Sequence, residues 1–290
     1  MGKAYGGKDV TRKMSNDTGR PRILLLLITV VSIAVVLYYG LVYESGQDEP
    51  DQEPNWSNSA PNDDANRDSP VNEGQTDEYY GARLAMVRNQ MQSRDVTDPD
   101  VLEAMRRVPR HEFVPSAQKS NAYEDHPLPI GHGQTISQPY IVAIMTEMLD
   151  LEAGKSRALE VGTGSGYQAA ILGEICDEVY SVEIVAPLAK SSTSTLGSLG
   201  YDNVHVKNAD GYFGWEEYAP YDAIIITCAA SHIPGPLIKQ LADGGRLVLP
   251  LGSPHSWQTL TIVEKHGNET TLNYKFPVVF VPMTGEVEKS

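Results

Sequence analysis

The chain has 290 residues, which is enough for one or two domains with a substantial hydrophobic core. Its formal net charge of −15 argues against nucleic acid as a main partner, because phosphate backbones are bound by an excess of lysine and arginine. The charge is unevenly distributed: residues 1–43 carry +4, residues 44–80 carry −10, and residues 81–290 carry −9.

Residues 1–22 are predicted to form a basic N-terminal tail, and residues 23–43 a transmembrane helix. The second segment has no charged residue, and as a helix it would span about 30 Å, the thickness of a bilayer core. Three tyrosines cluster toward its far end, as in an interfacial aromatic belt. The alternative is a cleaved signal peptide, whose apolar region is normally shorter and is followed by a small-residue cleavage site. We expect a retained single-pass membrane anchor.

The orientation of this anchor presents a conflict. The positive-inside rule places residues 1–22 in the cytoplasm and everything after Tyr43 on the other side. A domain that uses a cytosolic cofactor would instead have to face the cytoplasm. The sequence leaves both orientations of the domain possible, and the need for the cofactor favours the cytoplasmic side.

Residues 44–78 are predicted to be a disordered acidic linker. The segment is rich in Asp, Glu, Asn, Pro and Ser and has almost no large apolar side chains. Such a composition cannot bury enough apolar surface to offset the entropy of the chain.

The globular pattern begins at Tyr79, so residues 79–290 are expected to form one domain with a helical N-terminal lid. An amphipathic helix is predicted over 79–93, with Tyr80, Leu84, Val87 and Met91 on one face. A second helix over 100–108 follows the cap at Asp98 and Pro99.

An irregular stretch is predicted over 110–138. It contains His111, His126 and His132, whose spacing fits no zinc pattern, so we expect no metal site. Pro139 then begins a helix with Ile141, Ile144, Met145 and Met148 on one face.

The central motif of the chain is Leu159-Glu-Val-Gly-Thr-Gly-Ser-Gly-Tyr167. A short apolar strand leads into three alternating glycines and then into a helix, which is typical of a turn that approaches a nucleotide closely. Tyr167 stands where a dinucleotide fingerprint requires glycine. An incidental glycine-rich turn is the alternative. Two acids favour S-adenosyl-L-methionine: Glu160 precedes the turn, and Glu183 ends the next apolar run, where it could accept ribose hydroxyls.

Strands and helices alternate along the rest of the chain, which predicts a doubly wound, mostly parallel α/β sheet. The seven predicted strands are 158–161, 179–184, 204–207, 221–227, 246–250, 258–265 and 271–281, and the last two are expected to pair antiparallel. Helices are predicted over 167–172, 186–199 and 236–241. The two cysteines, Cys176 and Cys228, could form one disulfide, although two small buried apolar residues are the simpler interpretation.

From Tyr79 to Glu288 the chain resembles the protein-L-isoaspartate O-methyltransferases, a family of class I methyltransferases. The glycine turn is shared by many methyltransferases, whereas the Gly131-His-Gly-Gln-Thr-Ile-Ser-Gln-Pro139 loop is specific to this family. Further matching segments occur in the family's order: 108–115, 220–226, 244–250 and 280–282.

The resemblance implies the reaction of a protein-L-isoaspartate(D-aspartate) O-methyltransferase. The methyl group of S-adenosyl-L-methionine would pass to the free carboxylate of an L-isoaspartyl residue in a damaged protein or peptide, and the ester would close to a succinimide that initiates repair. The carboxylate is ionised at neutral pH, so the enzyme mainly has to align and desolvate the reactants. We expect isoaspartyl proteins and peptides as partners, a monomeric catalytic domain, and no role for nucleic acid or metal.

The resemblance also implies the site residues. Ser137 matches the active-site serine, whose hydroxyl would bind the incoming carboxylate; a serine that caps the helix beginning at Pro139 is the alternative. The expected cofactor-binding residues are Thr135 and Ile136 near Ser137, Glu160, Gly162 and Gly164 at the methionine end, Glu183 at the ribose, Asp210 and Gly211 at the adenine, and Thr284 closing over the cofactor. Val142 is assigned no role, because some relatives have histidine there.

Two other functions compete with this interpretation. One is a methyltransferase of the same fold that acts on a small molecule, against which the specific loop around Ser137 argues. The other is a membrane-tethered binding module without turnover. The intact glycines, Glu183, Asp210 and Ser137 argue against the second alternative, since a degenerate site would have lost some of them.

Overall fold

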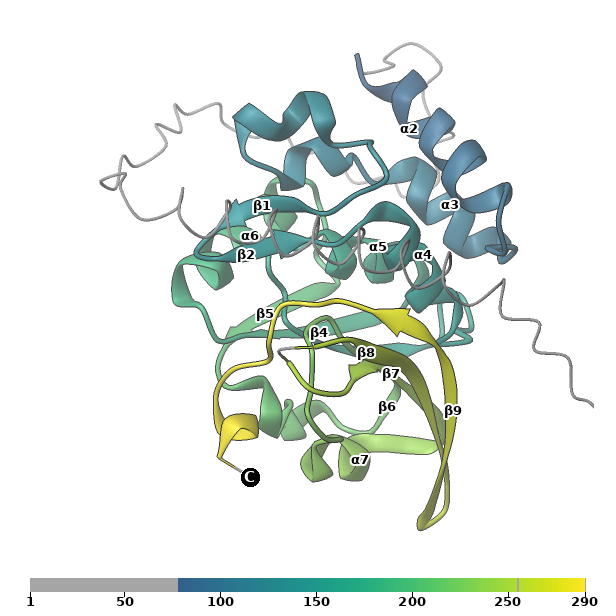
Figure 1. Ribbon diagram of the computed structural model, residues 1–290, viewed down its shortest axis with the longest axis vertical. Coiled ribbons are helices and arrows are strands. Elements are labelled where there is room, and N and C mark those ends of the chain that lie inside the picture. Colours follow the sequence, from purple (N-terminus) through teal and green to yellow (C-terminus); the bar gives the residue numbers. More distant parts are fainter. Residues whose placement is uncertain (1–77, 255, 290) are drawn as a thin grey trace, which may run out of the picture. The chain divides into compact units, whose positions relative to one another are not determined.

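A seven-stranded sheet in the order β5-β4-β3-β6-β7-β8-β9 forms the centre of the computed structural model (Figure 1). The structure describes residues 78–254 and 256–289, so the predicted tail, anchor and linker lie outside the described residues. The strands are β3 Arg157–Val161, β4 Glu178–Glu183, β5 Val204–Asn208, β6 Tyr221–Ile226, β7 Leu241–Leu251, β8 Gln258–His266 and β9 Glu269–Val278.

The pairing of the strands confirms the predicted mostly parallel sheet with C-terminal antiparallel strands. Strands β5, β4, β3, β6 and β7 are parallel neighbours, and β8 and β9 are added antiparallel. The chain leaves β3 toward β4 on one side and returns to β6 on the other. The carboxyl end of β3 is therefore a topological switch point, where open α/β sheets bind their ligands.

Alternating side chains of the strands supply two separate cores, one on each face of the sheet. Ala223 and Ile225 of β6 belong to the core that includes Leu172, while Ile224 and Ile226 belong to the core that includes Leu237. Because both faces are covered, the parallel strands are almost continuously apolar rather than alternating with polar residues.

Four helices cover the sheet: α4 Pro139–Glu147, α5 Tyr167–Ile175, α6 Ala186–Ser198 and α7 Gly235–Gln240. The first three lie on one side of the sheet, and α7 lies on the other (Figure 1). Short 3₁₀ turns follow β5 and β9: η4 Gly211–Phe213, η5 Glu216–Tyr218 and η6 Glu286–Glu288. On α4, Ile144 and Met145 are buried as predicted, but Val142 is also buried, and Ile141 and Met148 are only partly covered.

The N-terminal helices confirm the predicted positions and part of the predicted buried face. Helix α2 Tyr80–Met86 continues into a π-helical turn, η1 Val87–Gln92, and α3 Pro99–Arg107 follows. Asp98 caps α3 by accepting bonds from the main-chain N–H groups of residues 100 and 101. Val87 and Met91 are buried as predicted, whereas the prediction was wrong for Tyr80, which is exposed, and Leu84 is only partly covered. Arg83 and Met86 are buried on the same side as Val87 and Met91.

The stretch predicted as irregular contains regular structure. Two 3₁₀ turns, η2 Arg110–Phe113 and η3 Ser116–Asn121, precede a short antiparallel hairpin of β1 Leu128–Gly131 and β2 Gln134–Ile136. Its turn has positive φ at three consecutive residues, Gly131, His132 and Gly133. Glycine at two of these positions removes most of the steric cost of the turn. The hairpin delivers Ser137 to the beginning of α4.

The described chain tests the prediction about the two cysteines, whereas the predicted anchor at residues 23–43 lies outside it. Both cysteines are free thiols, with Cys176 buried and Cys228 partly buried, so they form no disulfide within residues 78–254 and 256–289. No helix in those same ranges combines the length and apolarity that a bilayer crossing requires.

Candidate active site

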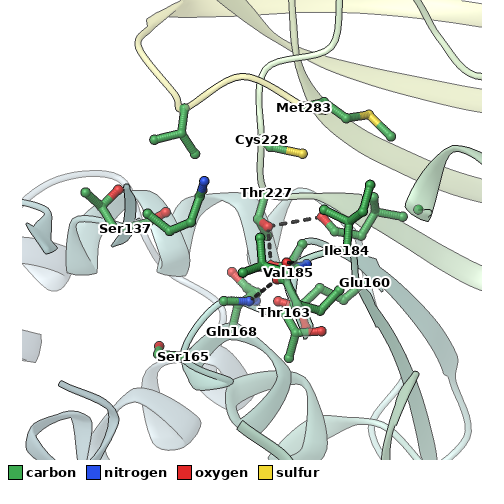
Figure 2. Close-up of a pocket in the computed structure, with 18 of the residues that line it drawn as sticks. Ser137, Glu160, Thr163, Ser165, Gln168, Ile184, Val185, Thr227, Cys228 and Met283 are labelled. Carbon is green, nitrogen blue, oxygen red and sulfur yellow. Dashed lines mark hydrogen bonds between the residues drawn. The ribbon is translucent and has the colours of Figure 1, made fainter. Parts of the chain in front are cut away.

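The candidate active site is a pocket at the carboxyl ends of β3, β4 and β6. Its floor is the glycine turn after β3, and residues that follow β4, β5 and β6 complete that side. Residues 134–137 of the hairpin and residues 281–284 after β9 form the remaining walls. Figure 2 shows Ser137 on one side of the pocket and Glu160 on the other. The pocket is thus assembled from segments distant in sequence.

The glycine turn leaves no room for side chains where it meets the neighbouring strand. Gly162 has a φ of +100°, and a Cβ there would lie 2.4 Å from Thr227 Oγ1. The Thr227 hydroxyl donates a hydrogen bond to the Gly162 carbonyl oxygen at 2.6 Å, which fixes the turn against β6. On the other side of the pocket floor, a Cβ on Gly211 would lie 2.4 Å from Val161 Cγ1. Both positions favour glycine because a Cβ would clash with a neighbouring side chain, and Gly162 in addition has a positive φ.

Glu183 holds the same turn from the end of β4. One carboxylate oxygen accepts the Gly164 N–H at 2.7 Å, and the other accepts the Val185 N–H at 2.8 Å. The side chain is buried, at 5% exposed, and lines the pocket. Each carboxylate oxygen has a further lone pair, so Glu183 can accept hydrogen bonds from a ligand while it organises the turn.

Glu160 is the most deeply buried acid of the site. It is 0% exposed, and its Oε2 accepts the Ser181 hydroxyl at 2.5 Å. The Ser181 hydroxyl also forms a hydrogen bond of 2.5 Å with the Thr163 hydroxyl. Burial, together with the nearby charge of Glu183, raises the pKa of Glu160 to about 8. The other oxygen, Oε1, is buried and has no hydrogen-bond partner among the described residues, so it can bind a polar group of a ligand, as a donor in the protonated acid and as an acceptor in the carboxylate.

Ser137 lies directly before α4, but it does not cap that helix. The N-cap residue is Gln138, and no side chain makes a capping hydrogen bond. The capping alternative for Ser137 therefore has no support in the geometry. Its side chain lines the pocket, while its main-chain carbonyl oxygen accepts a hydrogen bond from Arg110 Nη2 at 2.7 Å.

Nine of the ten predicted site residues line this one pocket, and Asp210 does not. The Asp210 carboxylate instead accepts main-chain N–H groups of Tyr212 at 2.9 Å and of Glu286 at 2.8 Å. A Cβ on Gly285 would lie 2.5 Å from Asp210 Oδ2, so the C-terminal segment is held closely against this acid. In this geometry Asp210 anchors the segment that carries Thr284, while its neighbour Gly211 reaches the pocket.

Several pocket residues were not predicted from the sequence. Thr227 and Cys228 follow β6, and Val281, Pro282 and Met283 follow β9. The position of the first two at the carboxyl end of an apolar strand was a usable signal, since ligands of open α/β sheets bind at such ends. The segment 281–283 had no comparable signal, because its place depends on the course of the chain after β9.

The pocket offers acceptors and hydroxyl groups rather than a strong base. None of the described residues that line it is His, Lys or Arg. Within residues 78–254 and 256–289, no cluster of three or more His, Cys, Asp or Glu side chains is arranged to hold a metal ion. Such a site suits a transfer between reactants that are already activated, in which alignment matters more than proton abstraction.

Comparison with known proteins gives one consistent result. Residues 82–288 match the family model described as protein-L-isoaspartate(D-aspartate) O-methyltransferase. The protein-L-isoaspartate O-methyltransferase 2 of Shewanella sediminis is 54% identical over 216 residues, covering 74% of this chain and 88% of the relative. The protein-L-isoaspartate O-methyltransferase of Opitutus terrae is 56% identical over 204 residues, covering 70% of this chain and 87% of the relative.

Solved structures agree with the sequence relatives. A protein-L-isoaspartate O-methyltransferase structure aligns with a TM-score of 0.64 and 28% identity, covering 72% of this chain and 67% of that chain. A Plasmodium falciparum protein of the same description, solved in complex with S-adenosyl-L-homocysteine, aligns with a TM-score of 0.60 and 27% identity. It covers 70% of this chain and 98% of that chain.

The raised pKa of Glu160 predicts a pH dependence of stability. The folded protein retains a proton on Glu160 up to about pH 8, whereas the unfolded chain releases it near pH 4.5, so stability falls as pH rises between these values. Glu160→Gln should remove this pH dependence. The difference in free energy of unfolding between the variant and the wild type should therefore shift in the variant's favour by on the order of 3 kcal/mol from pH 5 to pH 8. Urea unfolding at both pH values measures the difference, with the exposed Glu216→Gln as control. If the free energy of unfolding changes with pH by the same amount in the wild type and in Glu160→Gln, the prediction is contradicted.

Proposed function

The chain belongs to the protein-L-isoaspartate O-methyltransferase family, and from that membership we propose the function of its pocket. The enzyme uses S-adenosyl-L-methionine to methylate the free carboxylate of L-isoaspartyl residues in damaged proteins and peptides. This methyl ester initiates protein repair through a succinimide. The observation that carries the proposal is that Ser137, from the family-specific loop, and the Gly162–Gly164 turn line the same pocket.

The residues of the pocket fit the cofactor. The unpartnered Glu160 Oε1 would accept donor groups of the methionine end as the ionised carboxylate, a form that the positive charge of that end would favour by lowering the raised pKa of Glu160. The main chain of the Gly162–Gly164 turn lines the pocket and would lie next to the ligand. In the proposed arrangement Glu183 accepts the ribose hydroxyls, while Thr135, Ile136, Gly164, Gly211 and Thr284 line the rest of the cofactor site. Asp210 supports that site from outside by fixing the segment that carries Thr284.

The demands on the protein in the reaction are modest. When bound, S-adenosyl-L-methionine supplies a methyl group activated by its sulfonium sulfur. A bond forms between this methyl carbon and a carboxylate oxygen as the sulfur–methyl bond breaks, so no proton has to be moved. Ser137 would donate its hydroxyl to the other carboxylate oxygen and orient the nucleophile. The walls at residues 134–137 and 281–284 would limit water at the reacting atoms. A carboxylate is strongly hydrated in water, and excluding that water would make it more reactive toward the methyl group.

The activity is tested by offering the full-length chain radiolabelled S-adenosyl-L-methionine and matched peptides that differ only in aspartyl or isoaspartyl linkage. We expect base-labile label on the isoaspartyl peptide alone. Binding of S-adenosyl-L-homocysteine without label on either peptide would favour a small-molecule methyltransferase. Absence of cofactor binding would favour the tethered binding module.

Ser137→Ala should lower turnover on the isoaspartyl peptide far more than it lowers cofactor affinity. A hydrogen bond to a charged group is worth about 1.5–3 kcal/mol, so we expect a loss of about 10- to 100-fold in kcat/KM. The dissociation constant of S-adenosyl-L-homocysteine, measured by calorimetry, should change by less than about threefold. Ser165→Ala is the matched control, because Ser165 also lines the pocket but belongs to the glycine turn. An equal loss of turnover and cofactor affinity in Ser137→Ala would show that Ser137 does not act on the substrate carboxylate.

Glu183→Gln should mainly weaken cofactor binding. The amide keeps the volume of the side chain but replaces one acceptor oxygen with a donor, so the cofactor dissociation constant should rise by about 10-fold or more. Glu178→Gln, at the opposite end of β4, is the control. Unchanged affinity in Glu183→Gln would mean that the ribose is held elsewhere.

We further propose that residues 23–43 anchor the enzyme in a membrane with the catalytic domain on the cytoplasmic side. The support is the uncharged sequence of this segment and the cytosolic origin of the cofactor. The full-length chain should resist carbonate extraction from membranes, and deletion of residues 23–43 should release it, whereas deletion of residues 44–64 should not. Protease added to intact cells should leave the domain undigested. Digestion under those conditions would support the orientation that the positive-inside rule favours.

A further inference from the structure

Arg110 is the largest charged side chain in the interior of the described chain. It begins η2, directly after Pro109 in the Val-Pro-Arg segment, and it is 0% exposed. Arginine is almost never fully buried unless its charge has a partner. The proposed reaction assigns this residue no role, although it stands in a segment that matches the family.

The guanidinium connects three parts of the chain around the pocket. Nε donates to the Ala122 carbonyl oxygen at 2.7 Å, and Nη2 donates to the Ser137 carbonyl oxygen at 2.7 Å. Its central carbon lies 4.8 Å from the centre of the Tyr167 ring, which lines the pocket directly after the glycine turn. Arg110 thus binds the main chain of Ser137 and stacks on the residue that follows the cofactor turn.

No carboxylate compensates the charge of Arg110 within residues 78–254 and 256–289. The ion pairs among those residues do not include it, and the side chains that interact with its charge are the neutral Tyr167 and Tyr123. Its Nη1 makes no hydrogen bond of good geometry among those residues. Burial lowers the pKa of Arg110 to about 10, so the group remains positively charged at neutral pH. An unpaired buried charge is costly, and this one lies behind the residue to which the substrate carboxylate is proposed to bind.

We propose that Arg110 is a positioning residue for methyl transfer: it fixes the Ser137 main chain and provides, from behind, the positive charge that attracts the substrate carboxylate. The inference rests on the proposed function of the pocket. Arg110 itself does not line the pocket, so it acts through Ser137 and through its electrostatic field rather than by contact with the substrate. No other cationic side chain among the described residues lines the pocket, and a buried charge has a large effect on a nearby anion because the surrounding protein screens it weakly.

The test compares Arg110→Met, which removes the charge and the hydrogen bonds, with Arg110→Lys, which retains a cation. Arg83→Met is the matched control. Arg83 is also buried, at 5% exposed, and donates to a main-chain carbonyl, that of Arg106 at 2.6 Å, but it does not contact Ser137. Full-length proteins are assayed for kcat and KM on the isoaspartyl peptide, for S-adenosyl-L-homocysteine affinity, and for thermal stability.

In Arg110→Met we expect kcat/KM to fall at least about 10-fold, through a higher peptide KM because the charge is lost and through a lower kcat because Ser137 is no longer held, with cofactor affinity changed by less than about threefold. Arg110→Lys should have a peptide KM close to that of the wild type but a lower kcat. Lysine keeps the positive charge, but it cannot make the two guanidinium hydrogen bonds to the Ala122 and Ser137 carbonyl oxygens in the same geometry. Arg83→Met should lower stability without a change in peptide KM. The proposal is overturned if folded Arg110→Met keeps wild-type kinetics, if cofactor affinity falls in parallel, or if Arg83→Met shows the same kinetic loss.

If Arg110→Met does not fold, the kinetics of Arg110→Lys alone test the positioning role. A Lys variant that folds with wild-type kcat would overturn the positioning role. If neither variant folds, the ¹⁵N signal of the Arg110 guanidinium is followed in the wild type with S-adenosyl-L-homocysteine bound. It should shift when the isoaspartyl peptide is added and not when the aspartyl peptide is added. Equal shifts would overturn the proposal. A wild type without methylation of isoaspartyl peptide would instead overturn the proposed function itself.

Discussion

Two main-chain N–H groups hold the Glu183 carboxylate at the end of β4, and the rest of the site depends on this contact. It ties the glycine turn after β3 to the neighbouring strand and leaves each carboxylate oxygen a free lone pair. From the opposite side, the Thr227 hydroxyl fixes Gly162 against β6. The protein's own hydrogen bonds therefore hold the turn between two strands. A preformed cradle loses less entropy when a ligand binds than a loop that must first become ordered.

Much of this fold could be predicted from the sequence because each signal was local. Uninterrupted apolar runs predicted the parallel strands, since both faces of the sheet are covered. Asp98 followed by Pro99 marked the beginning of α3. The Gly131–Pro139 loop and the glycine turn each identified pocket residues by motif. The resemblance to a family placed Ser137, Thr284 and the glycine turn together, which neither composition nor periodicity could have done.

The features missed by the sequence depend on long-range contacts. The turn of the β1–β2 hairpin requires three consecutive positive φ values, one of them at His132, and propensity alone did not predict them. Tyr80 was predicted to face the core, but it is exposed at the first position of α2, while Arg83 and Met86 are buried. Asp210 was assigned to the ligand, yet it binds the main chain of residue 286, whose approach is set by the whole course of the chain after β9. Arg110 was visible as a motif residue, but only its buried contact with the Ser137 carbonyl gives it a role.

The pocket wall at residues 281–284 follows β9, the last strand of the sheet, whereas the wall at 134–137 precedes β3, the first strand of the sheet in the chain. A chain still emerging from the ribosome therefore has no complete pocket until residues 281–284 have left it. Ligand binding can stabilise only a domain that has its whole site, since binding shifts the folding equilibrium toward that state. A product truncated before residue 281 would therefore gain no stabilisation from the cofactor, however much cofactor the cell contains.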